Sequence, residues 1–337
     1  MFYSKEKKLN FKDVLIVPKS SVINSRKDVV LDTKIIFPVS GINWKGIPIM
    51  ASNMDNVGTF EMGLVLQKFH ITNAVSKFYE NKEWVKYVNN GLDLGYNFPT
   101  FGLEKISRID EFISHIAKKT NKNVENIVFD IPNGYIDKFS KIIKDTRKEF
   151  PQLGIIAGNV VTPEGVKLLM NSGADGVKVG IGSGGVCDTT DTTGVGYPQL
   201  SATIECSEEA KKYKGFIVSD GGIKITGDIS KAFAAGSGFV MIGSLLAAHK
   251  ESMSQIIRKE NKNYRELYGM SSTHAMNKHY GEVANYRTSE GKSILVEDRG
   301  PVKNTINNML GALRSTCTYI NAKNIGEIHE NSSFIVL

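Results

Sequence analysis

Apolar and polar positions follow a repeating block pattern along this chain. Short apolar runs rich in β-branched residues alternate with longer stretches in which apolar residues recur at helical spacing. The short runs do not alternate between apolar and polar residues, which is typical of parallel strands covered by helices. We predict strands at 47–52, 73–78, 97–102, 126–131, 154–160, 176–181, 216–220 and 239–244. We predict helices at 59–69, 82–91, 108–119, 138–150, 162–173, 197–213 and 226–236.

This order of elements predicts an α/β protein of the (β/α)8 TIM-barrel class. A doubly wound sheet is the main alternative, but no dinucleotide-binding glycine fingerprint follows an early strand. We expect residues 1–337 to form a single catalytic barrel domain without an inserted regulatory domain. Residues 1–46 form an extension that plugs the bottom of the barrel or packs on its side. The polar region at about 251–312 is long for a connection, and we expect an active-site flap there.

Composition narrows the classes of protein that fit. With 337 residues, 41% of them hydrophobic, the chain can bury a large core. It has no apolar run of about 18 residues, and its start has no apolar stretch of signal-peptide length, so we expect a cytoplasmic protein without membrane association. Its 3 cysteines are too few and too scattered for a disulfide framework or a zinc site.

The formal net charge of +7 comes from lysines spread along the chain. A nucleic-acid-binding protein would need a basic stripe with interleaved aromatic residues, and the sequence shows none. A dispersed positive charge instead fits a solvated surface, or the attraction of small anionic ligands such as nucleotides.

The active site of such a barrel lies at the carboxyl ends of its strands. The residues at these predicted ends are polar or titratable: Asn53, Asp55, Lys77, Asp130, Asn133, Asn159, Asp220, Gly243 and Ser244. Cys187 follows the sixth strand in a glycine-rich loop, residues 180–199. Because backbone N–H groups in such a loop can stabilise a thiolate, we predict that Cys187 is a nucleophile.

A glycine pair after the seventh strand and Gly243 after the eighth indicate phosphate binding. Gly221 and Gly222 would let the backbone approach a ligand closely, and Asp220 would accept hydrogen bonds from ribose hydroxyls. Lys77 is a candidate for a functional role because of its position at the barrel mouth. Glu290 lies in a segment whose composition is that of a solvated turn.

Several longer motifs carry a resemblance to a known family. They include "FKDVLIVPKS", "SNMDNVGTFEM", "SGADGVKVGIG", "TGVGYPQLSATIEC", "YGMSSTHAMNKHYG" and "LRSTCTYI", in one order over residues 9 to 335. The chain resembles the GMP reductases, within the superfamily that also contains IMP dehydrogenase. The resemblance implies NADPH-dependent reductive deamination of GMP to IMP and ammonia in purine nucleotide salvage, through a covalent thioimidate between Cys187 and the purine. It also implies a homotetramer.

The resemblance assigns site residues position by position. The implied catalytic residues are Cys187, Thr189, Lys77 and Glu290. The implied GMP contacts are Asp220, Gly221, Gly222, Gly243, Ser244, Gly269, Met270, Ser271, Arg287, Thr288, Ser289 and Gly291. The implied NADPH contacts are Ser25, Arg26, Phe78, Asp130, Ile131, Pro132, Ile181, Gly182, Met270, Tyr286 and Arg287, with Ser315, Thr316, Cys317 and Thr318 reaching the site of a neighbouring subunit. A potassium ion would be held by Gly182, Gly184 and Thr190.

The glycine-rich loop at residues 180–199, called the nucleophile loop below, departs from the family pattern. Asp188 stands where the family has a threonine, and Thr190 and Thr192 replace an arginine and a lysine. These changes add negative charge near the thiol, which disfavours a thiolate. Ser76 and Phe78 flank Lys77 where the family has histidines, and Pro132 replaces a small residue beside Asp130.

Two other functions compete with a reductase. IMP dehydrogenase shares the cysteine and the nucleotide site, but it uses a long mobile flap with an Arg-Tyr pair, which this chain lacks. A nucleotide-binding protein that has lost catalysis is suggested by the altered loop, while the retention of all the implied catalytic residues argues against it.

Overall fold

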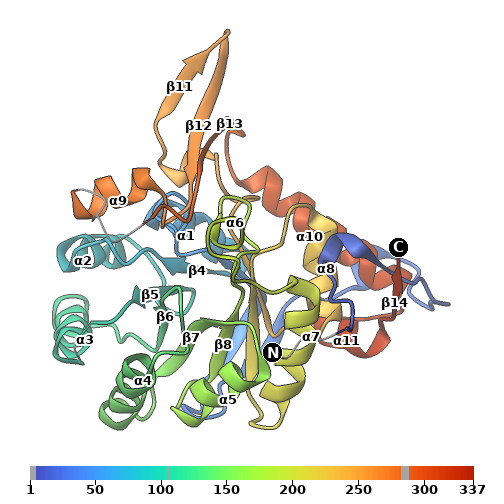
Figure 1. Ribbon diagram of the computed structural model, residues 1–337, viewed down its shortest axis with the longest axis horizontal. Helices are drawn as coiled ribbons and strands as arrows, with labels where there is room; N and C mark the ends of the chain where they lie inside the picture. Colours follow the sequence, from blue (N-terminus) through green and yellow to red (C-terminus); the bar gives the residue numbers. More distant parts are fainter. Residues whose placement is uncertain (1–4, 105, 282–287) are drawn as a thin grey trace.

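Eight parallel strands close into a barrel in the computed structural model, which describes residues 5–104, 106–281 and 288–337 (Figure 1). The barrel strands are β3 (Asn43–Ala51), β4 (Ile71–Val75), β5 (Asn97–Phe101), β6 (Asn126–Asp130), β7 (Gly154–Val160), β8 (Gly176–Val179), β9 (Phe216–Asp220) and β10 (Phe239–Ile242). Each strand pairs with the next along the chain, and β10 pairs with β3 in parallel, with Val240 opposite Ile49. The predicted (β/α)8 barrel is therefore confirmed, and the closing pair rules out a doubly wound sheet.

Helices surround the barrel on its outer face (Figure 1). They are α1 (Phe60–Leu66), α2 (Asn81–Asn89), α3 (Ile106–Thr120), α4 (Asp137–Glu149), α5 (Pro163–Asn171), α7 (Gln199–Lys211), α8 (Thr226–Ala234) and α10 (Lys303–Tyr319). Local sequence explains where several of these helices begin. For example, the Thr59 hydroxyl accepts a hydrogen bond from Met62 N, and Thr162 caps a helix whose first residue is Pro163.

The helix α10 was not among the predicted helices, and it begins inside the region set apart at 251–312. Its buried residues Ile306, Met309, Leu310 and Leu313 recur at helical spacing. Asparagines and threonines between them hid this apolar face in the sequence.

The barrel interior is layered from an aromatic bottom to a charged top. Phe37, Trp44, Phe216 and Phe239 fill the bottom, where Phe37 and Phe216 pack edge to face with ring centroids 4.9 Å apart. Apolar side chains from several strands, including Met50, form the same buried cluster. Charged side chains then follow at the carboxyl ends, so the interior is closed to solvent below the site.

The N-terminal extension packs on both the bottom and the side of the barrel. Strand β2 (Thr33–Ile36) pairs antiparallel with the start of β3, and it brings Phe37 under the barrel. Strand β1 (Val14–Ile16) pairs with β14 (Phe334–Val336) near the other end of the chain. The two ends of the chain are therefore joined to each other beside α8 and α11 (Ile328–Asn331) (Figure 1).

A second, antiparallel sheet projects beyond the carboxyl ends of the barrel strands (Figure 1). It consists of β11 (Ile256–Lys259), β12 (Lys262–Tyr268) and β13 (Ser293–Glu297), and α9 (Thr273–Tyr280) lies between β12 and β13 in the chain. This sheet with α9 is called the flap below. Within the part of the chain that the structure describes, no helix has the length and apolarity to cross a membrane.

A buried ion pair ties three segments together at the bottom of the barrel. Asp175 Oδ2 lies 2.7 Å from Arg147 Nη2 of α4 and accepts from Ile155 N at 2.9 Å. Its Oδ1 accepts from Val39 N and Ser40 N of the N-terminal extension at 2.8 and 2.9 Å. The side chain is fully buried, and both oxygens of its carboxylate accept hydrogen bonds.

We predict that Asp175→Ala destabilises the fold by about 3–5 kcal/mol, because it removes the carboxylate that the Arg147 guanidinium and three backbone amides share as an acceptor. The urea midpoint followed by circular dichroism measures this. Asp145→Ala, which removes an exposed carboxylate from the same helix, is the matched control. Equal midpoints for the two variants would contradict the assignment.

Candidate active site

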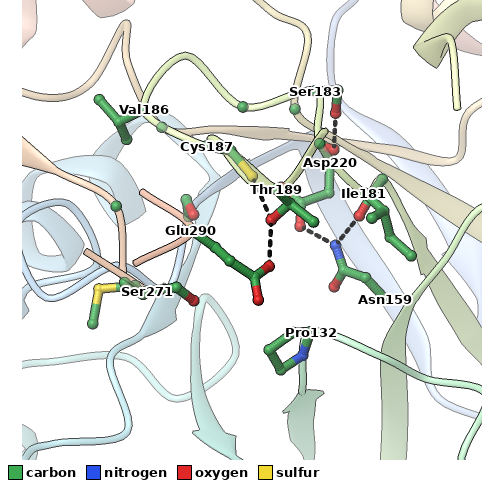
Figure 2. Close-up of a pocket in the computed structure, with 18 of the residues that line it drawn as sticks. Pro132, Asn159, Ile181, Ser183, Val186, Cys187, Thr189, Asp220, Ser271 and Glu290 are labelled. Carbon is green, nitrogen blue, oxygen red and sulfur yellow. Dashed lines mark hydrogen bonds between the residues drawn. The ribbon is translucent and has the colours of Figure 1, made fainter. Parts of the chain in front are cut away.

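A cavity of about 770 Å³ opens at the carboxyl ends of the barrel strands. It is lined by the nucleophile loop, by the turns after β9 and β10, and by residues 269–271 and 290, which lie between β12 and β13 in the chain. Figure 2 shows side chains from these separate segments converging on one space. The volume is in the range of small-molecule sites, so the cavity is the candidate active site.

Cys187 stands at one side of this cavity and begins a chain of three polar groups. Its Sγ lies 3.3 Å from Thr189 Oγ1, and the Thr189 hydroxyl donates to Glu290 Oε2 at 2.9 Å (Figure 2). Thr189 is the first residue of the short helix α6 (Thr189–Thr193). A thiol, a hydroxyl and a carboxylate in this order can pass a proton between a substrate at the sulfur and the carboxylate. We call these three residues the relay.

Backbone pairing, rather than side-chain contact alone, brings Glu290 to the relay. Asp188 N donates to Glu290 O at 2.8 Å, and Glu290 N donates to Ser271 O at 3.1 Å. Gly291 forms isolated β-bridges with both Cys187 and Ser272. The segment classed as a solvated turn on composition therefore lies across the nucleophile loop.

The glycine-rich turns lie against the nucleophile loop from the other side. Gly221 and Gly222 have φ values of +98° and +76°, in the left-handed region that favours glycine. Gly222 N donates to Ser183 O at 2.9 Å. A side chain at Gly221 would place its Cβ 2.3 Å from Ser183 Oγ. The turn after β9 thus needs glycine to fit beneath the loop.

The start of α8 is less open to a phosphate than expected. Asp228 of that helix accepts from Lys224 N and Ile225 N at 3.0 and 3.1 Å. These amides are already used by a carboxylate of the chain itself. A bound phosphate would therefore rest on the turns at Gly221 and at Gly243–Ser244, which both line the cavity.

Two carboxylates on the wall of the cavity share one ammonium that is buried beneath that wall. Lys178 Nζ lies 2.8 Å from Asp130 Oδ1 and 2.7 Å from Asp220 Oδ2. Burial by itself would raise the pKa of Asp130, but the Lys178 charge outweighs burial, so this pKa lies below its ordinary value. Burial would likewise lower the pKa of Lys178, and the two carboxylates raise it instead. Sequence reasoning missed Lys178, whose signal was a lysine within an otherwise apolar strand.

Lys77 and Phe78 lie beside the main cavity, not among the described residues that line it. Lys77 lines a small depression with Glu104 and Arg108, and its charge also lowers the pKa of Asp130. The Phe78 ring stacks on His279 of α9, with centroids 3.5 Å apart.

Asp55 connects the barrel to the flap. Its Oδ2 accepts from Tyr268 Oη at 2.9 Å and lies 2.8 Å from Lys278 Nζ and 2.6 Å from His279 Nε2. This residue of the loop after β3 therefore holds both β12 and α9 in place over the site.

Apart from Phe78 and the undescribed Tyr286 and Arg287, the residues that the resemblance implied for NADPH fall into two groups. Those that line the cavity are Asp130, Ile131, Pro132, Ile181, Gly182 and Met270. The others, Ser25 and Arg26 with Ser315, Thr316, Cys317 and Thr318, lie on the 3-10 helix η2 (Arg26–Asp28), its N-cap, and the neighbouring helix α10. The Cys317 side chain is 0% exposed, so it cannot contact a ligand directly.

The structure places the remaining implied residues as follows. Gly269, Ser271, Gly243, Ser244 and Gly184 line the cavity, Thr190 lies on the nucleophile loop, and Thr288, Ser289 and Gly291 lie next to Glu290 in the chain. Tyr286 and Arg287 lie outside the described residues.

The charge on the nucleophile loop is partly compensated. Lys292 Nζ lies 3.2 Å from Asp188 Oδ1, so a cation stands beside the aspartate that adjoins the thiol. The other two thiols cannot compete with Cys187. Burial raises the pKa of Cys317 to about 11 and that of Cys206 further still.

A cysteine joined to a hydroxyl and a carboxylate at the mouth of a (β/α)8 barrel defines an enzyme class in which a thiol attacks a bound small molecule. Comparisons with known proteins identify the family within this class. The family model described as "IMP dehydrogenase / GMP reductase domain" matches residues 8–337. The chain belongs to the IMP dehydrogenase/GMP reductase family.

Individual relatives match over nearly the whole chain. Human GMP reductase 2 is 46% identical over 332 residues, which are 97% of this chain and 94% of that protein. GMP reductases from Photobacterium profundum and Salmonella paratyphi C are each 45% identical, over 97% of this chain and 94% of theirs.

We predict that Asp188→Thr speeds alkylation of Cys187 by iodoacetamide by about twofold to fivefold near neutral pH, because it removes a negative charge that disfavours the thiolate. Lys292→Met should slow alkylation, since it removes the compensating cation. Mass spectrometry of the peptide containing Cys187 gives both rates. Asp191→Thr, at the next aspartate of the loop, is the control and should change the rate less. Identical rates in the three variants would contradict this account of the loop.

Proposed function

We propose that this protein is a GMP reductase, which converts GMP to IMP and ammonia with NADPH as the reductant. The relay of Cys187, Thr189 and Glu290 is the observation that carries the proposal, together with relatives of that name along the whole chain. The activity would interconvert purine nucleotides during salvage.

The relay accounts for the chemistry that such a reaction needs. Cys187 Sγ would attack C2 of the guanine, while its proton passes through Thr189 to Glu290 and on to the departing amino group. Ammonia then leaves, and a thioimidate between Sγ and C2 remains. NADPH supplies the hydride that C2 receives. The C2–Sγ bond then breaks, so that IMP and the free thiolate are formed.

The cavity offers groups that fit both ligands. Asp220, Gly221 and Ser244 would hold the ribose and phosphate of GMP, because a carboxylate accepts from ribose hydroxyls and glycine-rich turns present N–H groups to phosphate. Asp130, Ile181 and Met270 would contact NADPH on the other side of the cavity.

A homotetramer would complete the cofactor site. The group formed by Ser25, Arg26 and the segment Ser315–Thr318 is not among the described residues that line the cavity of its own chain. These residues, apart from the buried Cys317, would reach the cavity of a neighbouring subunit, where the planar guanidinium of Arg26 suits the additional phosphate of NADPH. The three cysteines are free, which fits the reducing cytoplasm, where we place the activity.

The direct test is loss of NADPH absorbance on addition of GMP, run beside reduction of NAD with IMP. We expect the first reaction and not the second. Cys187→Ala should lower turnover by at least about a thousandfold while GMP affinity changes little, because the thiol forms the covalent bond but contributes little to binding.

Cys206→Ala, at a buried cysteine outside the cavity, serves as the matched control and should keep its activity. Turnover by Cys187→Ala comparable to that of the intact enzyme would rule out the covalent route. Reduction of NAD with IMP would identify an IMP dehydrogenase. GMP binding without either reaction would identify a nucleotide-binding protein that has lost catalysis.

The nucleophile loop also offers oxygen ligands for a potassium ion. Thr190 Oγ1 lies 3.5 Å from Gly182 O. Gly184 O belongs to the same loop and accepts a hydrogen bond from Cys187 N at 3.1 Å. Backbone carbonyls are the ligands that commonly replace the hydration shell of potassium.

We predict that replacing potassium with lithium lowers kcat by about tenfold, because the loop that carries Cys187 loses a point of attachment. The NADPH assay in matched chloride salts measures this. Sodium chloride at equal ionic strength controls for screening, and equal rates in potassium and lithium would remove the ion from the proposal.

A further inference from the structure

Lys178 is a charged side chain inside the barrel, where the fold makes room for it. It lies on β8 between apolar residues, and its side chain is 1% exposed. In the register of the sheet it stands opposite Gly158 of β7 and Val218 of β9. A Cβ at Gly158 would lie 2.5 Å from the Cβ of Lys178, so the neighbouring strand must carry glycine there.

Each hydrogen of the ammonium has an acceptor within the protein. Nζ lies 2.8 Å from Asp130 Oδ1, 2.7 Å from Asp220 Oδ2 and 3.5 Å from Met241 Sδ. An ammonium has three N–H donors, and these contacts use all of them. Lys178 therefore does not need a ligand of its own, and any effect it has on ligands passes through the two carboxylates.

Asp130 and Asp220 come from different strands and face the same cavity. They are 26% and 20% exposed, and both line the cavity wall. Asn159 Nδ2 donates to Asp220 Oδ2 at 2.8 Å and to Gly180 O at 2.7 Å, which fixes the orientation of this carboxylate (Figure 2). Both carboxylates contact the same nitrogen, so removal of the ammonium would leave two like charges facing each other in a partly buried site, which favours uptake of a proton between them.

We propose that Lys178 is a positioning residue that keeps Asp130 and Asp220 ionised together, and that it thereby couples the GMP site to the NADPH site. The inference rests on the proposed function, in which Asp220 binds ribose hydroxyls and Asp130 contacts the cofactor. An ionised carboxylate only accepts hydrogen bonds, whereas a protonated one also donates and so mismatches a hydroxyl that must donate to it.

This coupling has a consequence that a purely structural lysine does not have. Loss of Lys178 should weaken both ligands, although it contacts neither. Loss of one carboxylate together with Lys178 should restore the ligand of the other carboxylate, because the remaining carboxylate no longer has a neighbour of like charge.

The experiment measures binding without turnover, GMP by calorimetry and NADPH by its fluorescence. Lys178→Met should weaken each ligand by at least about tenfold, since each depends on an ionised carboxylate. Lys178→Met/Asp130→Asn should restore GMP binding to within about threefold of the intact protein but not NADPH binding. Lys178→Met/Asp220→Asn should show the reverse. Lys178→Arg, which keeps the charge, should keep both affinities within about threefold.

Calorimetry in two buffers of different ionisation enthalpy adds a second readout. GMP binding to Lys178→Met should release more protons than binding to the intact protein, because the shared proton must leave Asp220. Lys231→Met is the matched control. Lys231 is also buried, donates to Phe11 O at 2.8 Å and lies 3.5 Å from Asp228, but it is not among the described residues that line the cavity. This control should change neither affinity nor proton release.

Unchanged affinities in Lys178→Met, or double variants that restore neither ligand, would overturn the inference and leave the proposed function standing. A wild-type protein that binds neither GMP nor NADPH would overturn both. If Lys178→Met does not fold, the double variants decide by comparison with Asp130→Asn and Asp220→Asn alone. Equal GMP affinity for Asp130→Asn and its double variant supports the inference, and a further loss in the double variant overturns it.

Discussion

The parallel pairing of β10 with β3 is the constraint on which the site depends, because it brings all the carboxyl ends of the barrel strands to one rim. Asp130 and Asp220 are far apart in the sequence, yet at the ends of β6 and β9 both lie at this rim within hydrogen-bonding distance of one ammonium. An open sheet with the same strands would leave its two edges far apart. The closed rim around the cavity therefore depends on one hydrogen-bonded seam, whereas the charged wall comes from β6, β8 and β9, which are linked through β7 in the sheet.

The relay depends on a second feature, which is the path of the chain across the rim of the barrel. Strands β12 and β13 are antiparallel, so the chain leaves the barrel and returns to it beside Val186, whose carbonyl accepts from Lys292 N at 3.1 Å. A Cβ at Gly269 would lie 2.6 Å from that same carbonyl. Close backbone packing, which needs glycine, thus sets the distance between Thr189 and Glu290 and makes the relay possible.

Charge at the site is balanced by geometry rather than by the composition of each segment. Counted along the sequence, the nucleophile loop gains negative charge relative to its family, but Lys292 approaches Asp188 from a distant segment. The same holds for the cavity wall, where one buried lysine serves two carboxylates from other strands. In both places a lysine from a segment that is remote in the sequence offsets the negative charge of a carboxylate.

The sequence by itself determined the strand and helix pattern, the barrel class and the candidacy of Cys187, because burial and periodicity are local signals. The composition around Glu290 indicated only a turn, and the asparagines of α10 concealed its apolar face. Lys178 was hidden within an apolar strand, and Lys77, at a strand end, came to lie beside the cavity rather than on its wall. Only the tertiary structure decided these positions, since the relay and the charged wall are fixed by register and closure between segments that share no local pattern.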